Sequence, residues 1–312
     1  MSLLIDMRDK GWMSDVDLKK LVSVNLSEKN IVCGPPAASM PDVQMVVVAS
    51  FFNDDVLSYL PNLRLIQKVG AGVDPMLADT NLPESIRIAR MGSLAQAQEM
   101  AEYCLTEVLA YQRNIRNYQT NQSQKIWNPS QPLKTQGTTI GVLGLGHIGK
   151  EIAKELSAFG FHVLGWSRSS KKIEGITSYT GLDGLFSMLS LSDYVIGILP
   201  STKKTDKLIN SRVLNHFKKG SVLINIGRGA LVVEEDLIEA INSGHLKGAT
   251  LDVVSKEPMP IAHPFWEHPN IFITPHVSGW NVDDAISDIA FNYNQLINNK
   301  PLLHEIERAR GY

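Results

Sequence analysis

The chain has 312 residues, of which 44% are hydrophobic and 20% are charged, and its formal net charge at pH 7 is −2. A chain of this length can bury a large core and is expected to form about two domains. The near balance of charge argues against a nucleic-acid-binding or anionic-membrane-binding surface. Cys33 and Cys104 are the only cysteines, which excludes a disulfide framework and a paired-cysteine metal motif.

The sequence shows no targeting or membrane-spanning pattern. The first residues lack a basic stretch followed by an apolar one, which is the pattern of a secretory signal. No run approaches the roughly 18 consecutive apolar residues of a membrane-spanning helix. We therefore expect a cytoplasmic protein that binds neither membranes nor nucleic acids.

Residues 1–100 alternate short apolar runs with helical patterns. Five runs are expected to be strands: residues 3–5, 31–33, 46–49, 65–69 and 86–89. Ser14 is placed to cap a helix whose first turn holds Asp15 and Asp17. This part of the chain is expected to form a small α/β domain of its own.

A longer helix is expected over residues 95–124, where apolar side chains mostly recur at i, i+3 and i+4. A helix of this length would pass from one domain to the other. Residues 124–137, which include Trp127, Pro129 and Pro132, are expected to form a loop.

The rest of the chain is organised around residues 138–172. An apolar run at 140–143 predicts a buried strand, residues 150–159 have helical periodicity, and a second apolar run at 161–166 predicts another strand. This order is a strand–helix–strand unit.

Three glycines follow the first of these strands directly: Gly144, Gly146 and Gly149. Glycines at this spacing give a tight turn, close approach of backbone N–H groups to a pyrophosphate, and close packing of helix on strand. Glycines also occur in ordinary turns. The strand–helix context nevertheless favours a dinucleotide site, which would include His147 and Ile148 at the positive end of the helix.

The residues after the second strand indicate which dinucleotide binds. An NAD-type unit places an Asp or Glu there to accept the ribose 2′-OH. This chain instead has Ser167, Arg168 and Ser169, followed by further Ser and Lys residues. Hydroxyls and a guanidinium suit a 2′-phosphate, which a carboxylate would repel. NADP(H) is therefore preferred over NAD(H); the alternative is a solvated basic turn with no role in the choice.

Apolar runs continue at 194–199, 222–226, 249–253 and 271–274, with helical patterns such as 234–242 between them. This order predicts a mainly parallel sheet. Ligands of such sheets bind beyond the carboxyl ends of the strands.

Polar residues follow three of these strand ends. Arg228 lies between two glycines just past the run at 222–226, which leaves its guanidinium uncovered for a carboxylate or a carbonyl. Asp252 ends the next run, and Glu257 follows before a proline. His276 comes after a proline past the last run.

A lone His or Glu is more often a surface or core residue, and a lone Arg has a structural role about as often as a functional one. Strand ends of one parallel sheet, however, bring Arg228, Glu257 and His276 to the same edge as the glycine loop. A carboxylate bonded to one imidazole nitrogen sets the tautomer and leaves the other nitrogen as an acid near neutral pH. The other histidines have no such setting, and no pair is spaced as HxxxH, so no metal site is expected.

At these motifs the chain resembles the D-2-hydroxyacid dehydrogenase family, and within it the glyoxylate/hydroxypyruvate reductases. The matching stretches cover nearly the whole chain: residues 68–74, 100–103, 144–149, 225–229, 251–253, 257–258, 274–276 and 308–312. The resemblance implies an α/β protein with a doubly wound parallel-sheet (Rossmann) cofactor domain, residues 101–280. This domain would be inserted in a smaller flavodoxin-like α/β substrate domain, residues 1–100 plus 281–312.

The resemblance also implies residue roles. Arg228 would bind the substrate and polarise its carbonyl, His276 would be the acid/base, and Glu257 would orient His276. Backbone N–H groups that bind the substrate carboxylate would come from Ala71, Gly72 and Val73. The cofactor groove would be lined by Leu199, Pro200, Thr205, Ile226 and Gly227, with Asp252 at the nicotinamide end.

Two positions depart from the close subgroup. That subgroup carries a Trp after the run at 46–49, where this chain has Ser50, Phe51 and Phe52. Trp280 stands where a smaller residue is expected. Both changes bear on the size of the substrate.

The function expected from the sequence is reduction of small 2-oxoacids by NADPH, glyoxylate or hydroxypyruvate first, with His276 as proton donor. The resemblance also implies a homodimer built around the helix at 95–124 and burying Trp127; alternatively, that helix only packs between the two domains. Two other functions stay open. One is an NAD-linked 2-hydroxyacid dehydrogenase of different specificity, although formate enzymes of the family carry Gln where Glu257 stands. The other is a dinucleotide-sensing corepressor on the same fold.

Overall fold

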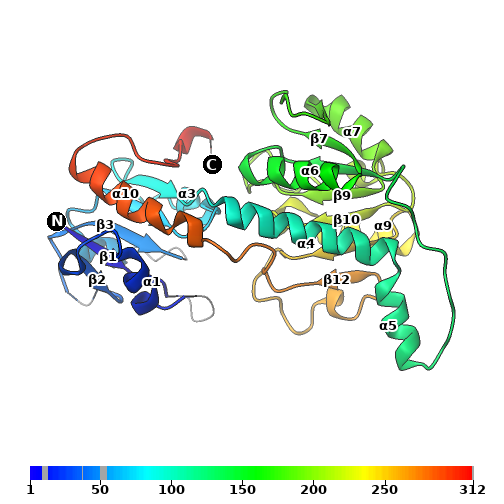
Figure 1. Ribbon diagram of the computed structural model, residues 1–312, viewed down its shortest axis with the longest axis horizontal. Coiled ribbons are helices and arrows are strands. Elements are labelled where there is room, and N and C mark those ends of the chain that lie inside the picture. Colours follow the sequence, from blue (N-terminus) through cyan, green and yellow to red (C-terminus); the bar gives the residue numbers. More distant parts are fainter. Residues whose placement is uncertain (9–12, 37, 50–54, 311–312) are drawn as a thin grey trace. The chain divides into compact units, whose positions relative to one another are not determined.

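The computed structural model describes residues 1–8, 13–36, 38–49 and 55–310, and Figure 1 shows its ribbon. The chain separates into two compact units. The terminal unit comprises Met1–Ala95 and Asn281–Tyr312, and the central unit comprises Gln96–Trp280. The first boundary lies at residue 95, whereas residue 100 is expected from the sequence.

The terminal unit contains a five-stranded parallel sheet with the strand order β2-β1-β3-β4-β5. Its strands are β1 Ser2–Ile5, β2 Ile31–Cys33, β3 Val43–Val48, β4 Leu65–Lys68 and β5 Arg87–Arg90. This is the flavodoxin-like order that the resemblance implies. The strand predicted at 46–49 begins earlier, at Val43.

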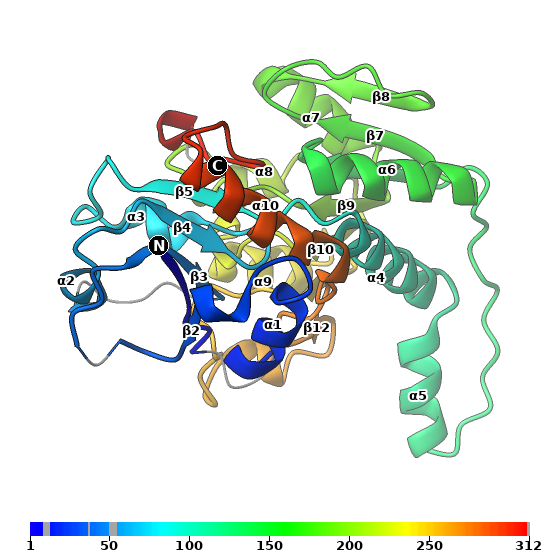
Figure 2. The same ribbon diagram turned by 60° about the vertical axis from the view of Figure 1, so that its left-hand side comes forward.

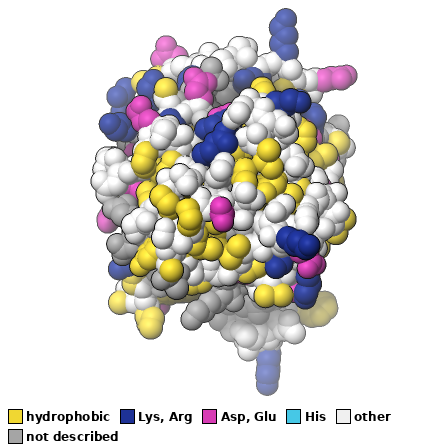
Figure 3. All heavy atoms as spheres, turned by 90° about the vertical axis from the view of Figure 1, so that its left-hand side faces the viewer, with side chains coloured by type: hydrophobic (Ala, Val, Ile, Leu, Met, Phe, Trp, Pro, Cys, Tyr) yellow, Lys and Arg dark blue, Asp and Glu magenta, His cyan; other side chains and the backbone are white. Residues whose placement is uncertain are grey.

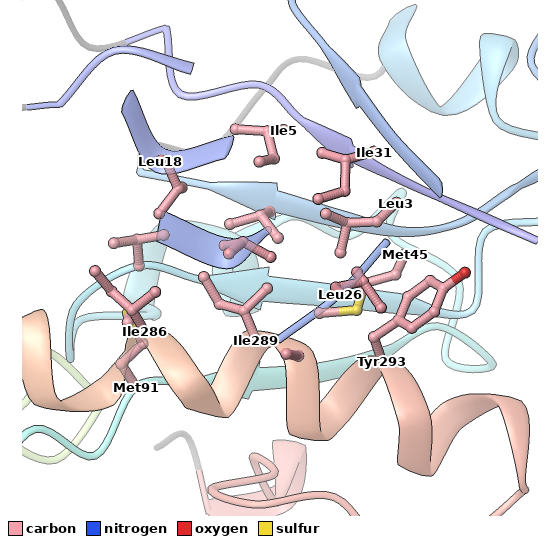
Figure 4. Packing of buried hydrophobic residues seen from close by; sticks show 14 of the residues in the cluster. Leu3, Ile5, Leu18, Leu26, Ile31, Met45, Met91, Ile286, Ile289 and Tyr293 are labelled. Carbon is pink, nitrogen blue, oxygen red and sulfur yellow. The ribbon is translucent and has the colours of Figure 1, made fainter. Parts of the chain in front are cut away.

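Helices cover both faces of this sheet. They are α1 Asp15–Val22, α2 Asp55–Tyr59, α3 Asp74–Ala78 and α10 Ile286–Ile297. Because alternate strand residues point to opposite faces, Leu3 and Ile5 pack with α1 and α10, whereas Leu4 packs with α2 and α3. Figure 4 shows the first of these cores, with Ile289 and Tyr293 of α10 beside the strands.

Helix α1 begins where the sequence predicts. The Ser14 side chain accepts a hydrogen bond from the backbone N–H of Asp17, and Asp15 and Asp17 lie in the positively polarised first turn. On α10, the Tyr293 hydroxyl donates to the carbonyl of Met1 at 2.7 Å. This bond ties the C-terminal helix to the start of the first strand.

The central unit contains seven parallel strands in the order β12-β11-β10-β9-β6-β7-β8. They are β6 Thr139–Leu143, β7 His162–Trp166, β8 Ile176–Tyr179, β9 Tyr194–Gly197, β10 Val222–Asn225, β11 Gly248–Leu251 and β12 Ile271–Ile273. Within this sheet, the chain first forms β6, β7 and β8 toward one edge. It then returns to the other side of β6 and forms β9 to β12 toward the opposite edge. This reversal is the switch point of a doubly wound Rossmann sheet, as predicted.

Helices also cover both faces of the central sheet. They are α4 Leu94–Gln112, α6 His147–Phe159, α7 Gly181–Leu191, α8 Ser211–Leu214 and α9 Glu234–Asn242, and α5 Ile115–Ser123 follows α4 without covering either face. Ile224 of β10 packs with α4 and α6, and its neighbour Leu223 packs with α7, α8 and α9. Burial on both faces explains why the strands of this unit are continuous apolar runs. Single-turn 3₁₀ helices occur at Glu28–Asn30, Gly229–Leu231, Pro264–Trp266, Asp283–Ala285 and Arg308–Arg310.

The prediction of a single helix over residues 95–124 is wrong, because α4 ends at Gln112 and α5 begins at Ile115. Asn114 between them has a φ of 58°, in the left-handed region that Asn adopts more readily than most residues. In Figure 1 and Figure 2 alike, α5 and the segment after it lie apart from the layers of the central unit. The Tyr118 hydroxyl lies 2.7 Å from the Ser130 hydroxyl, so this segment folds back on α5.

The surface is mixed in charge where Figure 3 shows it. On that face, Lys and Arg side chains are interspersed with Asp, Glu and hydrophobic side chains. Within the described ranges, none of the helices combines the length and the apolar character needed to cross a membrane.

Candidate active site

The carboxyl ends of the central strands form one row. Leu143 of β6 pairs with Gly197 of β9, which pairs with Asn225 of β10. Asn225 in turn pairs with Leu251 of β11, and Leu251 pairs with Ile273 of β12. When parallel strands end in register, the loops that follow them begin at the same edge of the sheet. The candidate residues of this unit lie in these loops.

The three glycines after β6 have different surroundings. Gly144 has a φ of 113°, a conformation that favours glycine. A Cβ on Gly149 would lie 1.8 Å from the carbonyl oxygen of Gly144, so the helix can approach the turn only without one. Gly146 is the N-cap of α6, and a Cβ there would meet nothing within 4 Å. Exposed His147 and half-buried Ile148 open α6 beside this space, which fits a pyrophosphate.

The turn after β7 presents a basic and a hydroxyl side chain. The backbone N–H of Ser167 donates to the carbonyl of Tyr179 at 3.1 Å, and its hydroxyl donates to the carbonyl of Ser169 at 2.9 Å. The Ser167 hydroxyl is thus engaged within its own turn. Arg168 and the Ser169 side chain are exposed, which fits recognition of a phosphate group.

The loops after β9 and β10 lie against each other. A Cβ on Gly227 would lie 2.9 Å from the backbone nitrogen and oxygen of Leu199. The Thr205 hydroxyl donates to the carbonyl of Pro200 at 2.6 Å and so closes the β9 loop. Leu199 and Ile226 are buried. The β9 loop also borders the glycine loop, because a Cβ on Gly144 would lie 2.8 Å from the carbonyl oxygen of Ile198.

Asn225 shapes the turn that carries Arg228. Its buried side-chain amide donates to the carbonyl of Arg228 at 2.9 Å and accepts from the backbone N–H of Gly227 at 3.3 Å. Nη1 of Arg228 donates to the carbonyl of Gly227 at 2.6 Å. Asn225 is not among the site residues expected from the sequence; an Asn two residues before a glycine, at the end of an apolar run, is the pattern that would have indicated it.

Gly229 brings the Arg228 turn against the loop that carries Glu257. A Cβ on Gly229 would lie 2.0 Å from the carbonyl carbon and oxygen of Val254. The backbone N–H of Val254 donates to Oε1 of Glu257 at 3.1 Å. The glycine is therefore required for the guanidinium and the carboxylate to occupy neighbouring turns.

His276 and Glu257 form a hydrogen-bonded pair. Nδ1 of His276 lies 2.7 Å from Oε2 of Glu257. Pairing with a carboxylate places a proton on Nδ1 and leaves Nε2 for other chemistry. The side chains are 52% and 39% exposed, respectively, so the pair lies at an accessible part of the sheet edge.

The environment of Glu257 keeps it ionised. Burial raises the pKa of the Glu257 carboxyl, but the hydrogen bond and charge of His276 lower it, as do the Val254 N–H and the charge of Arg228. The lowering interactions together outweigh burial, so the pKa lies below the ordinary value of 4.5.

Asp252 is 2% exposed, and both of its carboxylate oxygens accept hydrogen bonds from the loop after β12. Oδ1 accepts from the Thr274 hydroxyl at 2.6 Å and from the Val277 N–H at 2.8 Å. Oδ2 accepts from the Ser278 N–H at 3.0 Å, and the Asp252 carbonyl accepts from the His276 N–H at 2.9 Å. The resemblance implies a cofactor role for Asp252, and the hydrogen bonds in the structure are to the loop that carries His276.

The remaining predicted residues lie elsewhere. Ala71, Gly72 and Val73 belong to the terminal unit, between β4 and α3. There, Nη1 of Arg90 donates to the carbonyl of Ala71 at 3.2 Å, and Val73 is the N-cap of α3.

Of the two departures from the subgroup, Ser50 to Phe52 lie outside the described residues. Trp280 ends the central unit with its side chain 42% exposed, and its N–H donates to Glu99 at 2.6 Å. In the part of the chain that the structure describes, no group of three or more His, Cys, Asp or Glu residues is suited to a metal ion.

A doubly wound sheet with a glycine loop at its switch point, and with a His–Glu pair and an Arg in loops of the same edge, defines an NAD(P)-dependent oxidoreductase. Comparison with known proteins gives the family. The model of the D-isomer specific 2-hydroxyacid dehydrogenase NAD binding domain matches residues 105–278. The chain belongs to this family.

Relatives and solved structures agree with this assignment. A glyoxylate/hydroxypyruvate reductase A from Serratia proteamaculans is 40% identical over 239 residues, 75% of this chain and 76% of that protein. A D-isomer specific 2-hydroxyacid dehydrogenase from Xanthobacter autotrophicus, in complex with NADPH and MES, has a TM-score of 0.92 at 31% identity and covers 100% of this chain and 99% of its own. An NADPH-dependent glyoxylate/hydroxypyruvate reductase from Sinorhizobium meliloti, in complex with NADP and sulfate, has a TM-score of 0.91 at 27% identity, with both chains covered completely.

Two glycine substitutions should separate the structural from the binding part of the glycine loop. Gly149→Ala forces a Cβ into a backbone carbonyl and should lower the unfolding free energy by about 1–3 kcal/mol. Gly146→Ala points into open space and should change the unfolding free energy by less than about 0.5 kcal/mol, yet it should weaken NADPH binding about 5- to 150-fold. Thermal unfolding and fluorescence titration measure the two effects. Unimpaired NADPH binding by Gly146→Ala would place the pyrophosphate elsewhere.

The Glu257 pairing should be visible as pH-dependent stability. Since the pKa of Glu257 is depressed, the pairing contributes stability above pH 4.5 that is lost as the pH falls through the depressed value. The difference in Tm between the unmodified protein and Glu257→Gln should therefore be present at about pH 5 and shrink below it. Glu155→Gln, at an exposed position of α6, is the control and should show no such trend. A difference that grows toward acid pH would contradict the pairing.

Proposed function

We propose that the protein is an NADPH-dependent reductase of small 2-oxoacids, which converts glyoxylate to glycolate and hydroxypyruvate to D-glycerate. The observation that carries the proposal is the 2.7 Å pair of His276 and Glu257 at the sheet edge that also holds Arg228 and the glycine loop. The reductase names of the relatives and the NADPH and NADP bound in the two structural neighbours support it. No feature described above favours a corepressor or an NAD-linked enzyme of other specificity.

The residues of the central unit fit the cofactor. The open side of Gly146 and the N-terminus of α6 would hold the pyrophosphate, and Arg168 with Ser169 would hold the 2′-phosphate. The groove between these points would be lined by Leu199, Pro200, Thr205, Ile226 and Gly227. When bound, NADPH supplies the hydride that the keto carbon receives.

His276 is proposed as the proton donor. With Nδ1 engaged by Glu257, Nε2 holds the proton that passes to the substrate oxygen as that oxygen becomes an alkoxide. Glu257 sets the tautomer and stabilises the imidazolium before transfer. The planar guanidinium of Arg228 would bind the substrate carboxylate and stabilise the charge that develops on the oxygen.

The two units are proposed to divide the work. The central unit would be the dinucleotide-binding domain and the terminal unit the substrate domain. In the terminal unit, the backbone N–H groups of Ala71, Gly72 and Val73 would bind the substrate carboxylate, on a loop that Arg90 supports through the Ala71 carbonyl. In the central unit, the bulk of Trp280 would favour small substrates.

We also propose a homodimer, and a cytoplasmic location stays a prediction of the sequence. The segment after α5 carries exposed apolar side chains: Ile126 at 49%, Trp127 at 96% and Leu133 at 55%. Exposed apolar side chains on a segment that lies apart from the sheet layers are typical of an interface. A second copy of the chain would cover them.

Kinetics of site variants test the proposed acid. His276→Ala should lower kcat for glyoxylate about 10²–10⁴-fold, because water must then protonate the alkoxide, while the Kd for NADPH stays unchanged. Glu257→Gln should give a smaller loss. The double variant should be hardly slower than His276→Ala alone, since Glu257 has nothing left to orient. Near-normal kcat in His276→Ala would refute the assignment.

Matched controls accompany these variants. Arg228→Lys keeps the charge but loses the two-pronged geometry, so KM for the 2-oxoacid should rise and kcat should fall together. Arg212→Lys on α8, whose guanidinium lies over the Phe186 ring, should change neither. His162→Ala, at the exposed start of β7, should match the unmodified protein.

Cofactor preference should depend on Arg168. A charge-assisted bond to phosphate contributes about 1.5–3 kcal/mol, so Arg168→Ala should raise KM for NADPH roughly 10- to 150-fold. KM for NADH, which lacks the 2′-phosphate, should change little and serves as the internal control. Equal use of both cofactors by the unmodified protein would contradict the prediction.

The dimer can be tested by light scattering at micromolar concentration. The unmodified protein should have twice the mass of the chain, and Trp127→Glu should shift it toward the monomer because a charge would be buried in the interface. Ile261→Glu is the control, since Ile261 is 97% exposed and is also in the central unit. A monomeric unmodified protein would rule the dimer out.

A further inference from the structure

One face of α4 lies against the loop that bears His276. Gln96, Glu99, Met100 and Tyr103 follow the i, i+3, i+4 and i+7 spacing that places side chains on one side of a helix. Their partners all lie in residues 274–280, and both segments belong to the central unit. The function proposed above does not use these four residues.

Three of the contacts hold the far end of the loop. Nε2 of Gln96 donates to the carbonyl of Gly279 at 3.1 Å, and the Glu99 carboxylate accepts from the N–H of Trp280 at 2.6 Å. A Cβ on Gly279 would lie 2.6 Å from Cγ of Met100, so the close approach of loop to helix requires glycine there.

The fourth contact starts a chain of hydrogen bonds to the buried carboxylate. The Tyr103 hydroxyl lies 2.6 Å from the Thr274 hydroxyl, which donates to Oδ1 of Asp252 at 2.6 Å. Because the single proton of Thr274 is used toward Asp252, Tyr103 must be the donor to Thr274. Both hydroxyl protons of this hydrogen-bond series, those of Tyr103 and Thr274, therefore point toward Asp252.

Asp252 also holds the backbone conformation of His276, the proposed proton donor. His276 has a φ of 59°, a left-handed conformation that is unfavourable for a residue with a side chain. The Asp252 carbonyl and carboxylate bind the N–H groups of His276, Val277 and Ser278 and so hold the chain on both sides of this φ. Asp252 is therefore bonded to the backbone that carries the imidazole.

We propose that Tyr103 and Thr274 are positioning residues for His276, acting through Asp252 to hold the left-handed turn that aims the imidazole at the substrate. The inference rests on the proposed function, because it assigns His276 as the proton donor. The proposal thereby adds Tyr103, a residue of α4, to a set of residues that otherwise lie in loops after strands.

Substitution of the two hydroxyls tests the inference. Thr274→Val keeps the shape and removes both bonds, and kcat for glyoxylate should fall about 10- to 100-fold, the effect of a small misplacement of a catalytic group. Tyr103→Phe removes one bond and should lower kcat about 2- to 10-fold. Thr274→Ser restores the hydroxyl and should recover most of the rate. The Kd for NADPH should stay unchanged in all three.

A double variant distinguishes positioning from a general structural effect. In the His276→Ala background, Thr274→Val should cost nothing further in kcat, because no acid is left to position. Amide hydrogen exchange at Val277 and Ser278 should be faster in Thr274→Val than in the unmodified protein, whether or not substrate is turned over. Tyr111→Phe, on the same α4 and bonded to Thr250, is the control and should change neither rate nor exchange at those amides.

The outcomes separate the two proposals. An unmodified protein that reduces no 2-oxoacid overturns the proposed function, whereas the exchange measurement still reports on the hydrogen-bond chain. Normal kcat in both Thr274→Val and Tyr103→Phe, or an equal loss with and without His276, overturns the positioning role. If Thr274→Val does not fold, Tyr103→Phe alone decides.

Discussion

The alignment of strand ends in the central sheet is the constraint on which the site depends. Leu143, Gly197, Asn225, Leu251 and Ile273 are successive register partners, so the loops after five strands start from one line. The glycine loop, Arg228, Glu257 and His276 therefore all lie in loops at that edge of the sheet. A one-residue slip of any strand would move its loop and turn its buried side chains to the other face.

Two carboxylates have separate structural tasks at this edge. Asp252 is buried, and its carboxylate accepts hydrogen bonds from the backbone of the loop after β12. These bonds hold His276 in a left-handed turn. Glu257 is partly exposed and binds the imidazole itself. Gly229 lets the Arg228 turn pack directly on the Glu257 loop. Backbone placement and side-chain chemistry are thus assigned to different residues.

The sequence predicts both sheets and the glycine loop, because buried parallel strands leave continuous apolar runs and the glycines have fixed spacing. It does not predict the break at Asn114, because the periodicity of apolar residues continues across it and only the φ of one residue ends the helix. Nor does it predict the bonds of Tyr103 and Thr274 to Asp252. Their partners come from three distant elements, and hydrogen bonds of this kind leave no periodic pattern.

This sheet edge is expected to reduce small 2-oxoacids with NADPH as the hydride donor. The most direct test is to incubate the purified, unmodified protein with glyoxylate, hydroxypyruvate, pyruvate and bulkier 2-oxoacids, with NADPH and NADH in parallel, and to follow the loss of reduced-cofactor absorbance. The account predicts the highest kcat/KM for glyoxylate or hydroxypyruvate with NADPH and a lower value with NADH. Binding of NADPH without reduction of any 2-oxoacid would contradict it.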